Sequence, residues 1–520
     1  MADIARAVTR VDRIVDAVQR RTPDRPALVA EDGRTTTYGE LEQRIAATAE
    51  SLARRGLVAG QRALLVGENS VDMIVMLFAA MRVGAWAVPL NARMSIGEVD
   101  AITLHCAPRL IYFGAASPEA AAHAARHAAG HVDVEGLAGL AAWRNDGVEP
   151  EPEAQHGDPV AAMIYTSGST GQPKGVMLTH RNLMFVAETS LAQRVLVADD
   201  RIHHVLPISH SFGLASALLC GLHAGATLYP VARFSAEGLA RAIVEDGITV
   251  FQGVPAMYAR LIEWAQQTGR GLTPNRLRLC YIGGSVIDAP RKAAAEALLG
   301  LRLHHGYGLT ETSPAVSRTV GEPPPGDTTA GRPIPGIEVT LRDKGGALVG
   351  EGATGEGQTG EGQTGEIWVR GPNVMKGYFR DPAATRAAVD AEGWLHTGDL
   401  GQFGPRGDLR IVGRLKELII RGGFNVYPAE VENAIAAFPD VAQCAVVGRA
   451  VDGDEEVVAY IEPQAGRSVD VAALQAALRE RLAPYKLPAR IVCMERLPAS
   501  TTGKLLKAQI KALAASGSDA

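Results

Sequence analysis

The feature that most constrains the fold of this chain is the alternation of helix-like and strand-like segments before residue 320. Residues 38–56 have an amphipathic helical pattern that ends at Gly56, residues 62–67 have a buried-strand pattern, and residues 71–84 again have a helical pattern. Further strand-like segments at 160–165, 248–253 and 277–284 each lead into a loop with Gly, Ser or Pro. Alternating strands and helices predict parallel sheets of an α/β fold, whose ligands bind at the carboxyl ends of the strands.

The pattern changes after residue 330. Short strand-like segments at 336–343, 365–371 and 407–414 are separated by Gly and Pro turns, which predicts a small β subdomain. From Leu415 onward, strands alternate with helical patterns at 428–437 and 469–482 and with a final helix. Because single cores rarely grow beyond ~250–300 residues, 520 residues predict more than one domain. We therefore predict an N-terminal domain of residues 1–414, with α/β sheets and the β subdomain, and a small α+β C-terminal domain of residues 415–520.

Composition excludes several classes of protein. The 52 basic and 57 acidic residues are mixed along the chain, without the basic block of a nucleic-acid-binding arm. The longest apolar run near the N-terminus, residues 73–81, is shorter than the ~20 residues of a membrane span. The charged N-terminus lacks a signal-peptide core, and the five scattered cysteines predict reduced thiols. These features predict a cytoplasmic protein with no nucleic-acid partner and no transmembrane segment.

The most informative motif is YTSGSTGQPKG, residues 165–175. Its small residues would let backbone N–H groups close around phosphate oxygens, with hydroxyls and one lysine as further donors. It is not a Walker A loop, because Pro173 precedes the lysine where that motif requires Gly, and Gly175 follows it where the motif requires Ser or Thr. A flexible linker is the alternative, but the stretch follows a buried-strand pattern. The candidate phosphate-binding residues are Thr166, Ser167, Gly168, Ser169, Thr170, Gly171 and Lys174.

Four further motifs carry candidate side chains. In residues 304–314, Glu311 and Thr310 could hold a hard cation such as Mg²⁺ beside phosphates. In residues 393–401, Asp399 could accept two hydrogen bonds from a ribose diol. The others are residues 413–432 and residues 501–507, where Lys504 lies on a glycine loop before a short helix. Alone, each of these residues would more often be a solvated charge or a turn-stabilising group.

Taken in order, the five motifs resemble the signature set of the adenylate-forming superfamily, which includes acyl-CoA and aryl-CoA synthetases, amino-acid adenylation domains and luciferases. The resemblance extends from Tyr38 to Lys504. It implies that MgATP activates a carboxylic acid to an acyl-adenylate with release of pyrophosphate, and that the acyl group then passes to a thiol, here coenzyme A. Acid, ATP and CoA are the implied small-molecule partners, and a homodimer stays open.

The resemblance also implies residue roles. Lys504 would bridge the substrate carboxylate and the α-phosphate, Glu311 would serve Mg²⁺, and Asp399 and Arg414 would hold the ribose. The stretch around Gly284 and Ser285, with His305, Gly306, Tyr307 and Gly308, would flank the adenine. Lys416 would be the hinge about which a mobile C-terminal domain rotates, presenting Gly422 and Gly423 to the pantetheine tunnel.

The implied acyl pocket is mostly apolar or small, and no arginine lies among its residues. This predicts a monocarboxylic substrate, either an aryl acid or a medium- or long-chain fatty acid. His210, a catalytic candidate at the pocket wall, stands in a segment without an Asp to pair with an ammonium, so an amino-acid substrate is disfavoured. The candidate pocket residues are His210, Phe212, Val254, Met257, Gly283, Gly306 and Pro314.

Two alternatives to an acyl-CoA synthetase remain. The first is an acyl-AMP ligase that passes its product to a carrier protein; some such ligases have an insertion that restricts domain rotation. The second, a non-enzymatic nucleotide-binding relative, would be expected to lack Lys504 or Glu311.

A five-residue unit occurs three times at residues 350–364, before the family-like stretch 365–378. It has no Asp, so it differs from calcium-binding glycine-rich repeats, and no Lys or Arg for phosphate. We expect an exposed, mobile surface loop.

Overall fold

The computed structural model describes residues 8–115, 117–126, 131–134, 136–143, 148–151, 158–167, 173–273, 275–285, 287–349, 363–421, 424–451, 454–464, 466–499 and 505–516. Several predictions fall outside these residues. They concern Gly168, Ser169, Thr170 and Gly171 of the phosphate motif, Gly422 and Gly423, Lys504, and most of the repeat.

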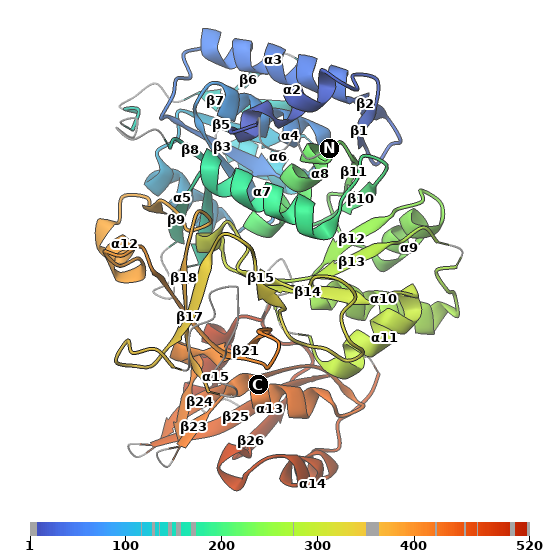
Figure 1. Cartoon of the computed structure of the whole chain (residues 1–520), viewed down its shortest axis with the longest axis vertical. Coiled ribbons are helices and arrows are strands. Elements are labelled where there is room, and N and C mark those ends of the chain that lie inside the picture. The colour runs from blue at the N-terminus through green and yellow to red at the C-terminus, as the bar shows by residue number, and fades with distance from the viewer. Residues whose placement is uncertain are drawn as a thin grey trace.

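The first layer is an eight-stranded sheet with parallel strands at its centre, as the alternating pattern predicted (Figure 1). The buried-strand pattern at 62–67 is strand β3, and the 38–56 pattern is helix α3 (Tyr38–Arg54), which Thr37 caps. Helix α3 packs on α4 (Val71–Arg82), with α5 (Ile96–Cys106) and α6 (Pro118–Arg126) following along the chain. The strand order is β19 (Gly377–Tyr378), β9 (Pro173–Thr179), β8 (Val160–Ser167), β4 (Trp86–Asn91), β3 (Arg62–Gly67), β5 (Leu110–Gly114), β7 (Gly139–Trp143) and β6 (His131–Asp133).

The second layer is a nine-stranded sheet in which β11, β10, β12, β13 and β14 run parallel. The largest buried apolar cluster contains residues of both sheets and of helices α3, α4 and α7 (His180–Arg194). A π-helix, η2 (Phe212–Leu219), and α8 (Cys220–His223) pack against α7. Helices α9 (Ala236–Val244), α10 (Pro255–Thr268) and α11 (Ala289–Leu299) enclose a separate apolar cluster with β12 and β13. The strand order is β16 (Arg332–Pro333), β15 (Ser317–Arg318), β14 (Leu303–Tyr307), β13 (Leu279–Ile282), β12 (Val250–Gly253), β10 (Arg201–His204), β11 (Thr227–Pro230), β1 (Pro26–Val29) and β2 (Thr35–Thr37).

The predicted β subdomain is a four-stranded antiparallel sheet of β17 (Glu338–Arg342), β18 (Gly365–Arg370), β20 (Leu395–Phe403) and β21 (Leu409–Arg414). In β18, buried and half-buried residues alternate, as in a strand with one face on a core. Helix α12 (Pro382–Ala388) precedes β20.

Residues from Ile419 onward build a smaller α+β unit with its own buried apolar clusters (lower part of Figure 1). The large and small units together confirm the predicted fold class, whereas the boundary between residues 414 and 415 stays a prediction. The unit contains β22 (Ile419–Arg421), β23 (Phe424–Val426), α13 (Pro428–Ala436), β24 (Val441–Val451), β25 (Asp454–Pro463), α14 (Val471–Arg481), β26 (Arg490–Cys493) and α15 (Lys507–Ser516). Among the helices of the described ranges, none is long and apolar enough to cross a membrane.

Candidate active site

The phosphate motif begins and ends in a β-hairpin. Strand β8 pairs with β9, so that Thr166 lies opposite Lys174 and the backbone of Ser167 lies opposite Pro173. The sequence predicted a loop from Thr166 onward; the structure instead extends the strand pairing to Ser167, whose backbone still pairs with that of Pro173. The hairpin therefore fixes Lys174 relative to the buried strand β8.

Tyr378 joins Lys174 to Glu311. The Lys174 ammonium lies 4.8 Å from the centroid of the Tyr378 ring, and the Tyr378 hydroxyl donates a 2.8 Å hydrogen bond to Oε1 of Glu311. Strand β19 holds Tyr378 beside β9, and the N–H of Met375 binds the backbone carbonyl of Glu311 at 2.9 Å. Burial, followed by the charge of Glu311, raises the pKa of Tyr378, which keeps the hydroxyl protonated as a donor. The motif analysis missed Tyr378, although the family-like stretch 365–378 ends on it.

Asp399 forms a second cluster on the β subdomain. It lies opposite Arg414 in the pairing of β20 with β21, and its Oδ1 is 2.9 Å from Nε of Arg414. Its Oδ2 accepts a 2.7 Å hydrogen bond from the hydroxyl of Tyr307 at the end of β14. Asp399 is only 4% exposed. Each carboxylate oxygen can accept more than one hydrogen bond, so these contacts are compatible with a further donor such as a diol.

The two clusters lie within electrostatic reach of each other. The pKa of Arg414 is raised chiefly by Asp399, and the charge of Glu311 also contributes. Glu311 lies in the short turn η3 (Thr310–Thr312) that follows β14, and Ser211 donates a 3.4 Å hydrogen bond to the Thr310 hydroxyl. The predicted ribose and metal residues thus converge at the carboxyl end of one parallel strand.

Several predicted acyl-pocket residues also come together at this edge. A Cβ atom placed on Gly283 would lie 2.9 Å from the Phe212 ring, and one placed on Gly284, where φ is +85°, would lie 3.4 Å from Val254. At Gly306 a Cβ atom would lie 2.9 Å from the Tyr281 hydroxyl. At Gly308 it would overlap the carbonyl of Pro314, so only glycine fits there.

The remaining predicted residues have other surroundings. Met257 packs half-buried against the apolar cluster of α9 to α11, and the side chain of His210 is exposed. His305 is buried, with Nδ1 3.1 Å from the Thr329 carbonyl, and burial lowers its pKa. Ser285 is exposed beyond β13, near the start of α11.

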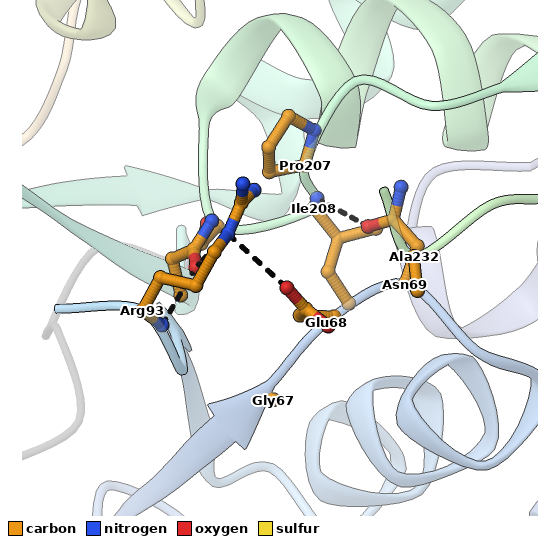
Figure 2. Close-up of a pocket in the computed structure, with 9 residues that line it drawn as sticks. Gly67, Glu68, Asn69, Arg93, Pro207, Ile208 and Ala232 are labelled. Carbon is orange, nitrogen blue, oxygen red and sulfur yellow. Dashed lines mark hydrogen bonds and ion pairs between the residues drawn. The ribbon is translucent and has the colours of Figure 1, made fainter. Parts of the chain in front are cut away.

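Asn69 lines a polar cavity of 10 Å³ and holds the segment that leads to His210 and Phe212 (Figure 2). Asn69 donates hydrogen bonds of 3.1 and 3.0 Å to the carbonyls of His204 and Leu206, and it accepts 3.0 Å from the N–H of Ile208. The cavity has room for about one water molecule and includes none of the predicted site residues. Asn69 therefore holds the segment in place, and the cavity is too small to be a substrate site.

Lys416 lies exposed in the turn η4 (Leu415–Glu417) between β21 and β22. Its neighbour Glu417 is 3.0 Å from Lys507, the first residue of α15, and Lys507 is also 2.8 Å from Glu432. The predicted hinge is thus tied to the helix that follows Lys504. Sequence reasoning missed Lys507, because a lysine near a chain end gives no local signal of burial.

In the described part of the chain, no three His, Cys, Asp or Glu side chains gather as a metal site. Glu311 alone still fits Mg²⁺, which commonly takes one or two protein carboxylates and completes its shell with phosphate oxygens and water.

The two-sheet α/β architecture, the β8–β9 hairpin that carries Thr166 and Lys174, and the two carboxylate clusters define a class of nucleotide-dependent enzymes. A family model for the AMP-binding enzyme matches residues 15–379, and one for the AMP-binding enzyme C-terminal domain matches residues 430–504. The chain belongs to the AMP-binding enzyme family, the adenylate-forming superfamily that its motifs resemble, and it is an AMP-forming acid–thiol ligase.

Its relatives include CoA ligases. A feruloyl-CoA synthase from an Amycolatopsis species is 35% identical over 496 residues, covering 93% of this chain and 95% of that protein. A Mycobacterium tuberculosis 3-[(3aS,4S,7aS)-7a-methyl-1,5-dioxo-octahydro-1H-inden-4-yl]propanoyl:CoA ligase is 33% identical over 523 residues, covering 97% and 98%. The solved structure of O-succinylbenzoate coenzyme A synthetase from Bacillus subtilis, in complex with ATP and magnesium ion, matches with a TM-score of 0.81 at 30% identity, covering 96% of this chain and 99% of that one.

Proposed function

We propose that this protein is an acyl-CoA synthetase. It activates an aromatic or aliphatic carboxylic acid with MgATP to acyl-AMP and pyrophosphate, and then forms the acyl-CoA thioester with release of AMP. The observation that carries the proposal is the convergence of Lys174, Tyr378 and Glu311 with Asp399 and Arg414 at the end of β14. The names of the relatives support CoA as acceptor, and the expectation of a single carboxylate stays a prediction.

The proposed chemistry depends on position and charge. Attack of the carboxylate on the α-phosphorus builds negative charge on phosphoryl oxygens, which fixed donors and cations stabilise. Thr166 and Lys174 would bind the β- and γ-phosphates. Mg²⁺, when bound at Glu311, would neutralise part of the phosphate charge, and the Tyr378 hydroxyl orients that carboxylate. Asp399, held between Tyr307 and Arg414, would bind the ribose.

The proposal is tested by pyrophosphate release across a panel of carboxylic acids, with and without CoA, together with detection of the thioester. Thioester formation with free CoA is the expected result. Adenylate that accumulates with CoA present and is consumed only by a carrier protein would instead show an acyl-AMP ligase. Absence of pyrophosphate release with every acid would contradict both readings.

Replacing Tyr378 by phenylalanine removes the hydroxyl that holds Glu311 while keeping the ring beside Lys174. A hydrogen bond to a charged group contributes ~1.5–3 kcal/mol. We therefore expect kcat/KM for MgATP to fall about ten- to a hundredfold. Initial rates at varied MgATP measure this loss. The matched control is Tyr112→Phe in β5, which removes a hydroxyl that donates a 2.8 Å hydrogen bond to the Ala138 carbonyl. Equal losses in both variants would mean that Tyr378 acts only through stability.

Deleting residues 350–359, two of the three repeat units, should leave both half-reactions unchanged. The third unit is kept because Gln402 donates a 2.7 Å hydrogen bond to the Thr364 hydroxyl. Loop-closure entropy changes by only ~0.6 kcal/mol for each doubling of loop length, so the melting temperature should move little. Gain or loss of CoA transfer in the deletion variant would show instead that the repeat regulates domain rotation.

A further inference from the structure

Two arginines are buried next to the proposed acyl site, and the part of the chain that the structure describes gives neither of them a carboxylate partner. Arg194, the last residue of α7, is 6% exposed, and Arg318 in β15 is 2% exposed. Buried guanidinium groups stay charged and are normally paired. No Asp or Glu of the described residues forms an ion pair with either of them, and burial together with the charge of Arg194 lowers the pKa of Arg318 to about 10. The two positive charges thus repel each other in the interior.

Strand register places Arg318 on the face of the predicted acyl pocket. Gln252, Tyr281 and His304 form one row across β12, β13 and β14. Gly283 and Gly306, which belong to the predicted pocket, follow Tyr281 and His304 by two residues and so lie on the same face, about 6.6 Å further along the strands. Arg318 lies directly opposite Gly306 in the pairing of β14 with β15.

Arg194 lies over the deeper row. Its guanidinium is 4.2 Å from the centroid of the Tyr281 ring, and its Nη1 donates hydrogen bonds to Oε1 of Gln252 at 2.8 Å and to the Ser216 carbonyl at 2.7 Å. Ser216 belongs to the π-helix η2, which begins at the pocket residue Phe212. The elements that carry the predicted pocket therefore also surround Arg194.

Three buried donors in this cluster have no acceptor among the described residues: Nε of Arg194, Nη1 of Arg318 and Nε2 of Gln252. Buried polar groups are nearly always hydrogen-bonded. A group that satisfied these donors would have to be a hydrogen-bond acceptor, and the two guanidinium charges favour an anion. Its position would be one row deeper than the pocket glycines.

We propose that Arg194 and Arg318 bind a second anionic group, a carboxylate or a sulfonate, at the far end of the acyl substrate. The inference rests on the proposed function and names its substrate class as dianionic acids. It departs from the sequence-based expectation of a monocarboxylic acid. That expectation held that no arginine belonged to the pocket, and only strand pairing brings Arg318 beside Gly306.

The first test uses the wild-type protein and ATP–pyrophosphate exchange. The substrates are α,ω-dicarboxylic acids of about five to nine carbons, a range chosen to span the ~6.6 Å offset between the two rows of residues. Each diacid is compared with its monomethyl ester and with the ω-keto acid of equal length. An aromatic diacid and its monoester form a further pair. We expect kcat/KM for the best diacid to exceed that of its monoester by about 100-fold or more. A ratio near one for every pair, or a preference for the keto acid over the diacid, would overturn the inference.

The second test uses Arg318→Met, with Arg332→Met as the matched control. Arg332 faces Arg318 on β16, but its side chain is 65% exposed. Arg318→Met should lose most of the diacid preference while it still activates monoesters, whereas Arg332→Met should keep the wild-type ratio. An unchanged ratio in Arg318→Met would contradict the assignment.

If Arg318→Met fails to fold, thermal shifts of the wild-type protein decide the question. A diacid should raise the melting temperature more than its monoester does, and equal shifts would count against the inference. The outcomes also separate this inference from the proposed function. Exchange with monoesters but no diacid preference removes only the second-anion site, whereas no exchange with any acid removes the proposed function itself.

Discussion

Lys504→Ala is expected to slow formation of the acyl-adenylate by about 10²–10³-fold, the loss typical of one preorganised donor at a charged transition state, or ~3–4 kcal/mol. The resemblance predicts that Lys504 bridges the carboxylate and the α-phosphate, two anions that repel each other until a cation lies between them. Pyrophosphate exchange with a saturating acid measures this half-reaction.

Two further measurements sharpen the Lys504 prediction. When acyl-AMP and CoA are supplied directly, Lys504→Ala should still form the thioester at close to the wild-type rate. The resemblance implies that rotation of the C-terminal domain about the hinge withdraws Lys504 from the site before this second half-reaction. Lys511→Ala, which removes an exposed lysine on α15, should leave both half-reactions unchanged. Wild-type adenylation by Lys504→Ala would show that another group bridges the two anions.

Lys416→Pro is expected to separate the two half-reactions in the opposite sense. Lys416 lies exposed in the η4 turn between the β subdomain and the C-terminal unit. Proline fixes φ near −65° and also restricts the preceding residue. A hinge of this kind depends on a few residues that absorb changes in φ and ψ. Adenylate formation should stay within a few-fold of wild type, whereas thioester formation should fall by about 100-fold, the loss that a small misplacement of reacting groups can cause.

Lys416→Ala is the matched control, because it removes the same charge without restricting the backbone, and it should keep both half-reactions. Rapid-quench measurement of acyl-AMP and of acyl-CoA in one time course distinguishes the two steps. Full thioester turnover by Lys416→Pro would place the hinge elsewhere. In that case, the next contact to test is the ion pair between Glu417, the last residue of this turn, and Lys507. This ion pair would be the contact that holds the conformation seen here.

Local signals were sufficient for much of the fold. The buried-strand pattern at 62–67 became β3, and the helical patterns at 38–56 and 71–84 became α3 and α4, each within two residues of its predicted C-terminal end. Such elements are readable because side-chain periods of two and 3.6 lie within a single segment. The prediction was less accurate at 277–284, where the strand β13 spans only Leu279–Ile282, although the N–H of Gly283 still donates a 3.2 Å hydrogen bond to the Gly253 carbonyl of β12.

The sequence by itself determined the α/β class, the order of the motifs and the identity of Glu311, Asp399 and Arg414 as candidates. Only the tertiary structure decided that Tyr378 stands between Lys174 and Glu311, that Lys507 pairs with Glu417 of the predicted hinge segment, and that Arg194 and Arg318 lie beside residues of the predicted acyl pocket. The physical reason is that these contacts depend on which strands become neighbours. Hydrophobic periodicity specifies which face of a strand is buried but carries no information on the partner across the ladder, so a charged residue's counterpart appears only when the sheets assemble.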